Sequence, residues 1–298
     1  TPHYERTVFG RATDFYNTEA ALLQSGKLIA IDRPSDAKET FWREHLLLQL
    51  RSDWNVGGRT WPKGSLLVTD AAAFLRGQRH FTALFIHGNK AQGARTRSLA
   101  DFTTTRTHVL LSVLDNVAGR IEEWQTLGAR WVGRKVAAPF PGTLGVQALH
   151  DPLLARDALA EAYFLTYTDF LTPDSLLLGH TGRDARDTLK ARPHFFDAQG
   201  MKVEQRFATS KDSTRVPYFV VWPPGATADA TNPTLLYGYG GFEISQQPWY
   251  SGGFGSAWYR HGGVLVVANI RGGGEFGPGW HQAAVKAGKQ KSFDDFAA

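Results

Sequence analysis

The sequence predicts a β-rich first part over residues 1–200, followed by the beginning of an α/β domain over residues 201–298. Two observations support this division. Short strand-like runs alternate with turn signals as far as Gly200, whereas nearly continuous apolar runs that end in glycines follow it. With 298 residues and 42% hydrophobic content, the chain is long enough for two ordinary domains and a sizeable core.

The strands expected in the first part are short. In "AYFLTYT", Tyr163, Leu165 and Tyr167 fall on one face, and the run from Thr172 to Asp174 supplies the next turn. Further strands are expected over residues 27–31, 45–51, 66–69, 81–86, 108–114, 120–125 and 175–179. Many short antiparallel strands over roughly 200 residues are typical of a sandwich, a barrel or a propeller, and periodicity alone does not choose among them. At roughly 40–50 residues per blade, a propeller of this length has about four blades.

The second part reads differently. Strands are expected in "VPYFVVWPP", "NPTLLYGYGG" and "HGGVLVVANIRGGG", the last two nearly all apolar. Continuous apolar strands that end in Gly-rich turns are typical of a sheet covered by helices on both faces. Ser292 followed by Asp295 resembles a capping box and predicts a helix that starts at Ser292.

Both ends suggest that the chain is part of something longer. It opens at Thr1, its only methionine is Met201, and the helix expected at Ser292 has barely a turn before Ala298. A helix that short is marginal on its own. We therefore expect an internal piece of a larger protein.

The distribution of charged residues bears on whether the protein binds nucleic acid or membranes. The 33 basic and 28 acidic residues are scattered, which indicates a mildly basic surface and favours neither a nucleic-acid nor a membrane partner. No apolar run approaches the roughly 20 residues of a spanning helix, and no signal-peptide pattern opens the chain. Because there is no cysteine, the redox environment cannot be read, and the compartment, cytoplasmic or periplasmic, stays open.

The run "RGGGEFG" superficially fits a dinucleotide-binding fingerprint. Gly272, Gly274 and Gly277 have the G-x-G-x-x-G spacing, and acidic Asp294 and Asp295 follow roughly 20 residues later. The fingerprint needs a helix that begins at the glycines, but a Pro-Gly pair follows at once and the expected helix starts later. The sequence therefore predicts a tight loop in which backbone passes close to backbone, and no cofactor.

Catalytic motifs are missing from the residues themselves. No serine has glycine two residues before it, as the G-x-S-x-G nucleophile elbow requires, and Ser256 comes nearest with Phe254 at that place. The ten histidines are dispersed and no H-E-x-x-H spacing occurs, so no metal site is expected. His261 and His281 are interpreted as loop or packing histidines.

Two long motifs strongly resemble the prolyl oligopeptidase family of serine peptidases. They are "LLYGYGGFEIS" and "GGVLVVANIRGGGEFGPGWHQAAVKAGKQKSFDDF", within residues 233–296, and looser resemblance lies in "AYFLTYTDFLTPDSLLLG" and "RSLADFTTTRTHVLLSVLDNV". That family joins a seven-bladed β-propeller to an α/β-hydrolase domain. The resemblance implies a partial β-propeller, about four of seven blades, over residues 1–200, and the N-terminal part of the α/β-hydrolase (peptidase) domain over residues 201–298.

The resemblance also implies roles for two residues. Tyr239 matches the tyrosine whose hydroxyl contributes to the oxyanion hole, and Phe242 matches the wall of the apolar pocket that receives a proline ring. The family's catalytic Ser, Asp and His lie beyond Ala298, so this chain alone is expected to be an inactive part of a serine endopeptidase. Its expected partners are a short peptide substrate and the remainder of the hydrolase domain, in a monomer.

Specificity is less closely defined. Gly241-Phe242 resembles the prolyl branch, whereas the branch that cleaves after basic residues tends to carry Ser-Tyr there. We therefore expect cleavage after proline through an acyl-enzyme. The alternatives are basic or broader specificity within the same family, and a non-catalytic propeller-based binding module.

Overall fold

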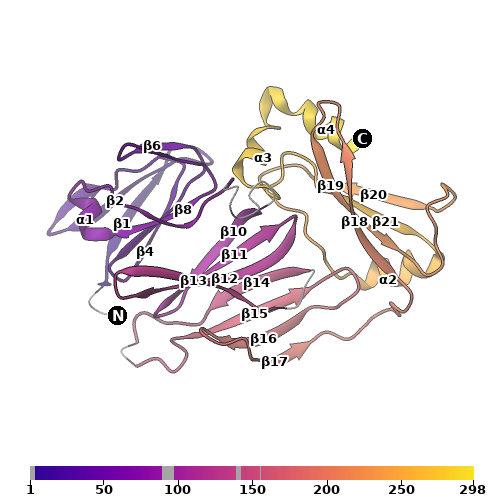
Figure 1. The fold of residues 1–298 in the computed structure, drawn as a ribbon, viewed down its shortest axis with the longest axis horizontal. Coiled ribbons are helices and arrows are strands. Elements are labelled where there is room, and N and C mark those ends of the chain that lie inside the picture. Colours follow the sequence, from indigo (N-terminus) through magenta and orange to yellow (C-terminus); the bar gives the residue numbers. More distant parts are fainter. Residues whose placement is uncertain (1–3, 89–96, 139–141, 155) are drawn as a thin grey trace.

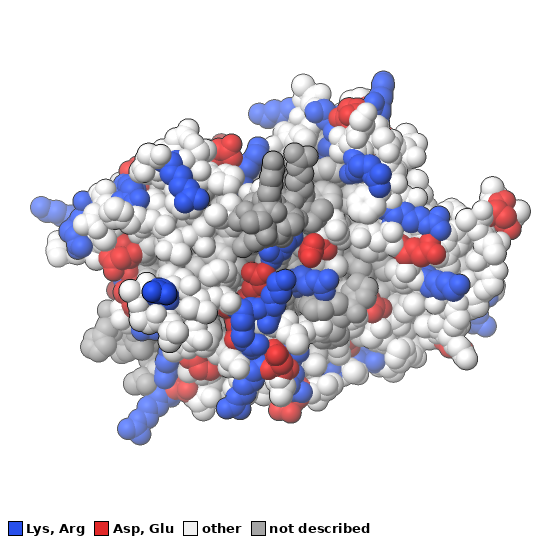
Figure 2. Space-filling view, viewed as in Figure 1, with Lys and Arg blue, Asp and Glu red and all other residues white. Residues whose placement is uncertain are grey.

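The computed structural model describes residues 4–88, 97–138, 142–154 and 156–298, and short β-strands dominate this part of the chain (Figure 1). Figure 1 shows three parts along the long axis: the indigo N-terminal sheets, the magenta sheets in the middle, and the orange and yellow C-terminal part. Within the described ranges, no helix is long and apolar enough to cross a membrane. Figure 2 shows Lys and Arg side chains interspersed with Asp and Glu over the visible face.

The first part of the chain forms four antiparallel sheets within the described residues, whose strands follow one another along the chain except that a hairpin lies between the second and third strands of the second sheet. Their strands are β1 (Thr7–Ala12), β2 (Thr18–Gln24) and β3 (Lys27–Ala30); β4 (Lys38–Trp42), β5 (His45–Gln49), β8 (Leu66–Asp70) and β9 (Thr82–Phe85); β10 (Arg97–Thr104), β11 (His108–Asp115), β12 (Ala118–Leu127) and β13 (Arg130–Val136); and β14 (Thr143–Ala148), β15 (Ala162–Thr168), β16 (Ser175–His180) and β17 (Arg186–Ala191). The hairpin of β6 (Trp54–Val56) and β7 (Arg59–Trp61) extends from the second sheet, and helix α1 (Ala71–Leu75) follows β8. Every strand predicted in this part is present.

These sheets are stacked face to face as propeller blades. In β5, Leu46 and Leu48 pack toward the first sheet, in a cluster with Ala20, whereas Leu47 packs toward the third sheet. Alternate residues of one strand are therefore buried on opposite faces, because a neighbouring sheet covers each face. Four sheets of this kind confirm the partial propeller.

The strand β15 shows how sequence periodicity becomes packing. Tyr163, Leu165 and Tyr167 lie in one hydrophobic cluster with Leu110 of the third sheet and Leu144 of their own. The face of "AYFLTYT" that was predicted from the alternation thus packs between the third and fourth blades.

The last sheet has the order β18 (Lys202–Thr209), β19 (Arg215–Trp222), β21 (Val264–Ala268) and β20 (Thr234–Gly238). The pair β20–β21 is parallel, and its crossover contains helices α2 (Gly252–Ala257) and η3 (Tyr259–His261). Parallel neighbours need such a crossover, and this sheet is the start of the expected α/β domain. The chain then forms α3 (Pro278–Gln282), η4 (Lys286–Gly288) and α4 (Gln290–Ala297).

Three local expectations for the second part were wrong. The strand β20 lies at the edge of the sheet, so Leu235, Leu236 and Tyr237 are 40–43% exposed and not buried. Helix α4 begins at Gln290, and Ser292 caps no helix. A helix was expected only from Ser292, but helix α3 begins directly after Gly277. Proline is tolerated at the first helical position because the N–H that it lacks would have no partner there.

The division between the two parts stays a prediction. Strand β17 ends at Ala191 and β18 starts at Lys202, on either side of the expected boundary at Gly200. An aromatic cluster nevertheless spans it, since Phe170 of the propeller part packs with Phe219 and Tyr259 of the second part.

Candidate functional site

The turn from Tyr239 to Phe242 lies at the carboxyl end of β20. Gly240 has a φ of 59°, and Phe242 and Glu243 have φ values of 51° and 60°. The left-handed region costs non-glycine residues free energy and is found most often at sites where the surroundings impose it. The backbone of this turn is therefore held in an unusual shape next to the exposed edge of the sheet.

Tyr239 presents a free hydroxyl. Its side chain is 43% exposed, and its hydroxyl has no hydrogen-bond partner within the described residues. The ring rests over Gly241, where a Cβ would lie 3.4 Å from the ring. Tyr237, the other tyrosine of the motif, instead packs edge-on against Trp249, with ring centroids 6.0 Å apart.

Phe242 is 63% exposed and contacts a loop of the propeller part. Its ring centroid lies 6.0 Å from that of Phe15, which belongs to the loop between β1 and β2. The propeller part therefore reaches the residue for which the family resemblance implies a place in the substrate pocket.

An ion pair extends this contact. Arg51, which follows β5, binds the Glu243 carboxylate through Nε at 3.0 Å and through Nη2. The guanidinium lies 3.9 Å from the centre of the Tyr16 ring, where a cation–π attraction adds to the ion pair. Gln282 of α3 donates to the Arg51 carbonyl at 2.8 Å.

His281 joins the glycine run of the second part to the loop between β1 and β2 of the propeller part. Its Nδ1 donates to the Gly272 carbonyl at 2.8 Å, and its Nε2 accepts from the Tyr16 hydroxyl at 3.2 Å. The Glu243 amide donates to the same Gly272 carbonyl at 3.2 Å. His281 is 5% exposed and is a packing histidine, as expected, whereas His261 lies exposed at the end of η3.

The glycine run packs against the Tyr239 turn. Gly272 has a φ of 103°, and a Cβ there would lie 2.1 Å from the Gly240 carbonyl oxygen. At Gly274 a Cβ would lie 2.3 Å from the Glu243 carbonyl oxygen. Contacts this short leave room for glycine only, and the predicted close approach of backbone to backbone is confirmed.

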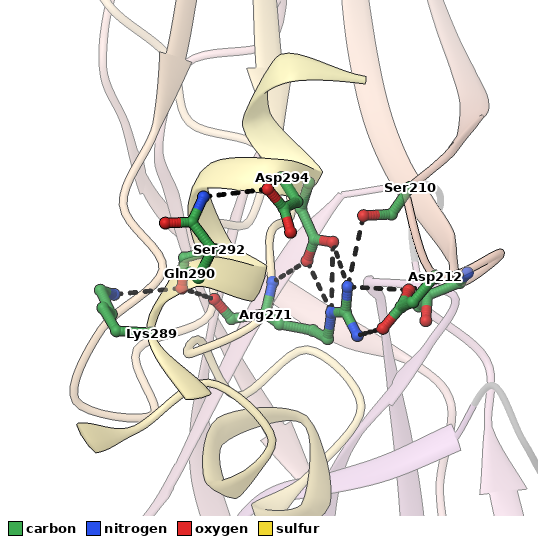
Figure 3. Close-up of polar contacts among 9 residues, drawn as sticks. Ser210, Asp212, Arg271, Lys289, Gln290, Ser292 and Asp294 are labelled. Atoms are coloured by element: carbon green, nitrogen blue, oxygen red, sulfur yellow. Dashed lines mark hydrogen bonds and ion pairs between the residues drawn. The ribbon is translucent and has the colours of Figure 1, made fainter. Parts of the chain in front are cut away.

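A buried charge network anchors the same run (Figure 3). The Arg271 guanidinium and amide bind Asp295 of α4, and the guanidinium also binds Asp212, at 2.5 Å, and Ser210. The bonds from Arg271 hold the pKa of Asp212 far below its usual value, and the two carboxylates raise the pKa of Arg271. Asp295, one of the acidic residues considered for cofactor binding, is thus occupied by Arg271.

Glu275 is a buried carboxyl in the glycine run. Its side chain accepts from the Gln246 amide at 2.8 Å, and its carbonyl accepts from Ser98 of the propeller part. Burial raises the pKa of Glu275 to about 7, although the hydrogen bonds that its carboxylate accepts from Gln246 and Asn269 oppose the shift. Its Oε2 has no hydrogen-bond partner within the described residues.

No nucleophile is assembled among the described residues. The Ser256 hydroxyl donates to the Gly252 carbonyl, one turn earlier in α2, at 2.8 Å. The sequence placed Tyr239 and Phe242 on one turn but gave no signal for Arg51, which lies 192 residues from Glu243. Glu275 was visible in the sequence as a charged residue inside an apolar, glycine-rich run.

Known proteins are similar to this chain in sequence. A family model described as the prolyl oligopeptidase family matches residues 250–298. An uncharacterized peptidase of Sinorhizobium fredii is 34% identical over 295 residues, which are 97% of this chain and 39% of the relative. A prolyl endopeptidase of Elizabethkingia meningoseptica is 36% identical over 135 residues, which are 45% of this chain and 19% of the relative.

Solved structures agree with the fold. A post-proline cleaving enzyme from Rickettsia typhi matches with a TM-score of 0.85 and 28% identity, over 98% of this chain and 42% of that structure. The chain thus spans only 39% of the length of the Sinorhizobium relative and 42% of the Rickettsia structure.

Together the blades and the parallel strand pair define the class of protein that joins a β-propeller to an α/β-hydrolase domain. Within that class, the chain belongs to the prolyl oligopeptidase family of serine peptidases. The resemblance seen in the two motifs is confirmed. The roles of Tyr239 and Phe242 stay predictions, because no relative's name assigns them.

Proposed function

We propose that this chain is part of a serine oligopeptidase that cleaves short peptides after proline through an acyl-enzyme. The observation that carries the proposal is the turn from Tyr239 to Phe242, at the carboxyl end of β20: its phenol has no hydrogen-bond partner among the described residues, and its phenyl ring is exposed. In open α/β sheets, ligands bind beyond the carboxyl ends of the strands. Relatives named prolyl endopeptidase and post-proline cleaving enzyme support the specificity.

In the proposed reaction, a serine from the remainder of the hydrolase domain attacks the carbonyl carbon of the proline residue. The carbonyl oxygen gains negative charge as the new C–O bond forms, and the Tyr239 hydroxyl donates to that oxygen. A preorganised donor of this kind supplies roughly 3–4 kcal/mol of transition-state stabilisation. A histidine takes the serine proton during the attack and gives it to the leaving amine as the C–N bond breaks, and water then hydrolyses the ester.

Phe242 takes the other role. Its ring forms one wall of an apolar pocket for the proline ring of the substrate, which burial removes from water. The contacts with Phe15 and with Arg51, through Glu243, fix this wall from the propeller side. The propeller itself limits entry to short peptides.

Matched peptide substrates test the proposal in the complete protein. We expect faster hydrolysis after proline than after arginine or lysine, and inhibition by a serine-directed reagent. Faster cleavage after arginine or lysine would replace proline specificity with basic specificity. Absence of turnover with every peptide would favour a propeller-based binding module.

A further inference from the structure

Lys289 joins the start of α4 to the Tyr239 turn. Its ammonium donates to the Gly240 carbonyl at 2.5 Å and to the Ser292 hydroxyl at 3.1 Å. The Ser292 hydroxyl in turn donates to the Arg271 carbonyl at 2.7 Å. Figure 3 shows Lys289, Ser292 and Arg271 linked in this order.

Helix α4, which directly follows Lys289, is held firmly against the glycine run. Ser292 and Asp295 are 2% and 3% exposed, and both bind Arg271 across the space between α4 and the glycine run. Asp295 accepts from the Arg271 amide at 2.9 Å and from the guanidinium at 2.6 Å. Because charge-assisted bonds are about twice as strong as neutral ones, these contacts fix α4 relative to Arg271.

The acceptor of the Lys289 bond is confined as well. The Gly240 carbonyl oxygen would lie 2.1 Å from a Cβ at Gly272, and a Cβ at Gly240 would lie 2.7 Å from the Ile270 side chain. The peptide group between Gly240 and Gly241 is thus held between the glycine run and Lys289. The ring of Tyr239 rests on Gly241, so this peptide group is the platform that sets the direction of the ring.

Local helix preference does not explain this lysine. Lys289 precedes the first residue of α4, where the helix dipole disfavours a cation, and it makes no capping bond. Lys291, two residues later, is exposed and makes no such contact with the turn. The tertiary contact with Gly240 therefore accounts for the position of the Lys289 ammonium.

We propose that Lys289 is a positioning residue for Tyr239: it holds the Gly240–Gly241 peptide group so that the phenol points at the developing oxyanion. This inference rests on the proposed role of Tyr239 in catalysis. Lys289 itself touches neither substrate nor reacting atoms, so its effect passes through the tyrosine.

A double-mutant cycle in the complete enzyme tests it. We expect Lys289→Met to lower kcat for a slow proline amide about tenfold, with KM changed less than about twofold, because displacement of a donor weakens transition-state stabilisation. In a Tyr239→Phe background the same substitution should change kcat less than about twofold. Lys291→Met, the matched control two residues further along the chain, should leave kcat unchanged in both backgrounds.

Hydrogen exchange provides a readout that does not need activity. We expect faster amide exchange over residues 237–245 in Lys289→Met than in the parent enzyme or in Lys291→Met. Lys289→Gln, which keeps a neutral N–H donor, should give an intermediate kcat and carries the test if Lys289→Met does not fold.

Three results would overturn the inference: an unchanged kcat in Lys289→Met, a loss of equal size in both backgrounds, or unchanged exchange over residues 237–245. An unchanged kcat in Tyr239→Phe alone would instead remove the proposed oxyanion role, and this inference with it. The exchange measurement would then show separately whether Lys289 holds the turn.

Discussion

Arg51 and Glu243 form an ion pair between the propeller part and the turn that carries Phe242. The two side chains are only 20% and 22% exposed, and Arg51 also lies against the Tyr16 ring. Glu243 directly follows Phe242 and has a φ of 60°, so the pair acts on backbone that is already in a disfavoured region. The propeller therefore stabilises the turn directly as well as through the shared core.

Arg51→Met tests the contribution of this pair to stability. We expect the free energy of unfolding of the complete protein to fall by about 1–3 kcal/mol, because the substitution leaves a partly buried carboxylate without its partner. Urea denaturation measures the change. Arg11→Met breaks the exposed pair of Arg11 with Glu19 and should cost less than about 0.5 kcal/mol. Equal effects in the two variants would show that Arg51 is no anchor.

Glu275 gives stability a specific pH dependence. Burial raises its pKa from 4.5 to about 7, so between these values the folded protein keeps a proton that the unfolded chain releases. The free energy of unfolding therefore falls as pH rises from about 4.5 to 7, by roughly 1–3 kcal/mol. Below pH 4.5 both states are protonated, and the carboxyl then adds no pH dependence.

Glu275→Gln isolates this effect because an amide does not titrate. We expect urea denaturation at pH 5 and at pH 8 to show a smaller loss of stability in Glu275→Gln than in the parent protein. The control is Glu19→Gln, whose side chain is exposed and which should keep the parent pH dependence. A parent-like loss in Glu275→Gln would mean that Glu275 titrates as an ordinary carboxyl.

Strand prediction succeeded where neighbouring sheets impose a pattern on the sequence. Residues 162–168 alternate because one face packs on the third blade, and the structure gives the strand the same bounds. Strand β1 was missed because all six of its residues are exposed, which leaves no hydrophobic periodicity. An edge strand of this kind is specified by its backbone pairing with β2 and not by side-chain burial.

The candidate site was predictable only in part. Tyr239 and Phe242 were found from a long motif, but their supports are separated in sequence: Arg51 lies 192 residues from Glu243, and Lys289 lies 49 residues from Gly240. Ser292 and Asp295 were misread as a capping box because both side chains bind Arg271 and not the helix backbone. Local spacing cannot distinguish these two uses of the same residue types.

The 298-residue chain alone is expected to be inactive against a proline-containing peptide. Oxyanion donors cannot form an acyl-enzyme without a nucleophile and its base, and no such pair was recognised in the sequence. A chromogenic proline substrate measures this with the chain by itself, and the complete protein serves as the positive control. Turnover by the chain alone that a serine-directed inhibitor blocks would show that the nucleophile has been overlooked.

Phe242→Ala should affect substrate binding. Loss of an apolar pocket wall weakens ground state and transition state alike, so we expect KM for proline substrates to rise with kcat little changed. Steady-state kinetics with a proline amide measures both constants. Phe293→Ala, which removes another exposed phenyl ring, on α4, should leave both near the parent values. A fall in kcat at constant KM would contradict a role as pocket wall.

Tyr239→Phe separates catalysis from packing, because it keeps the ring over Gly241 and removes only the hydroxyl. We expect kcat for a slow amide to fall by roughly 10²–10³-fold, with KM little changed. The amide is the sensitive substrate, since a reactive ester or a rate-limiting conformational step hides part of the loss. Tyr237→Phe, in the tyrosine that packs on Trp249, should leave kcat unchanged. If Tyr239→Phe lowers the free energy of unfolding but leaves amide hydrolysis at the parent rate, the tyrosine is structural.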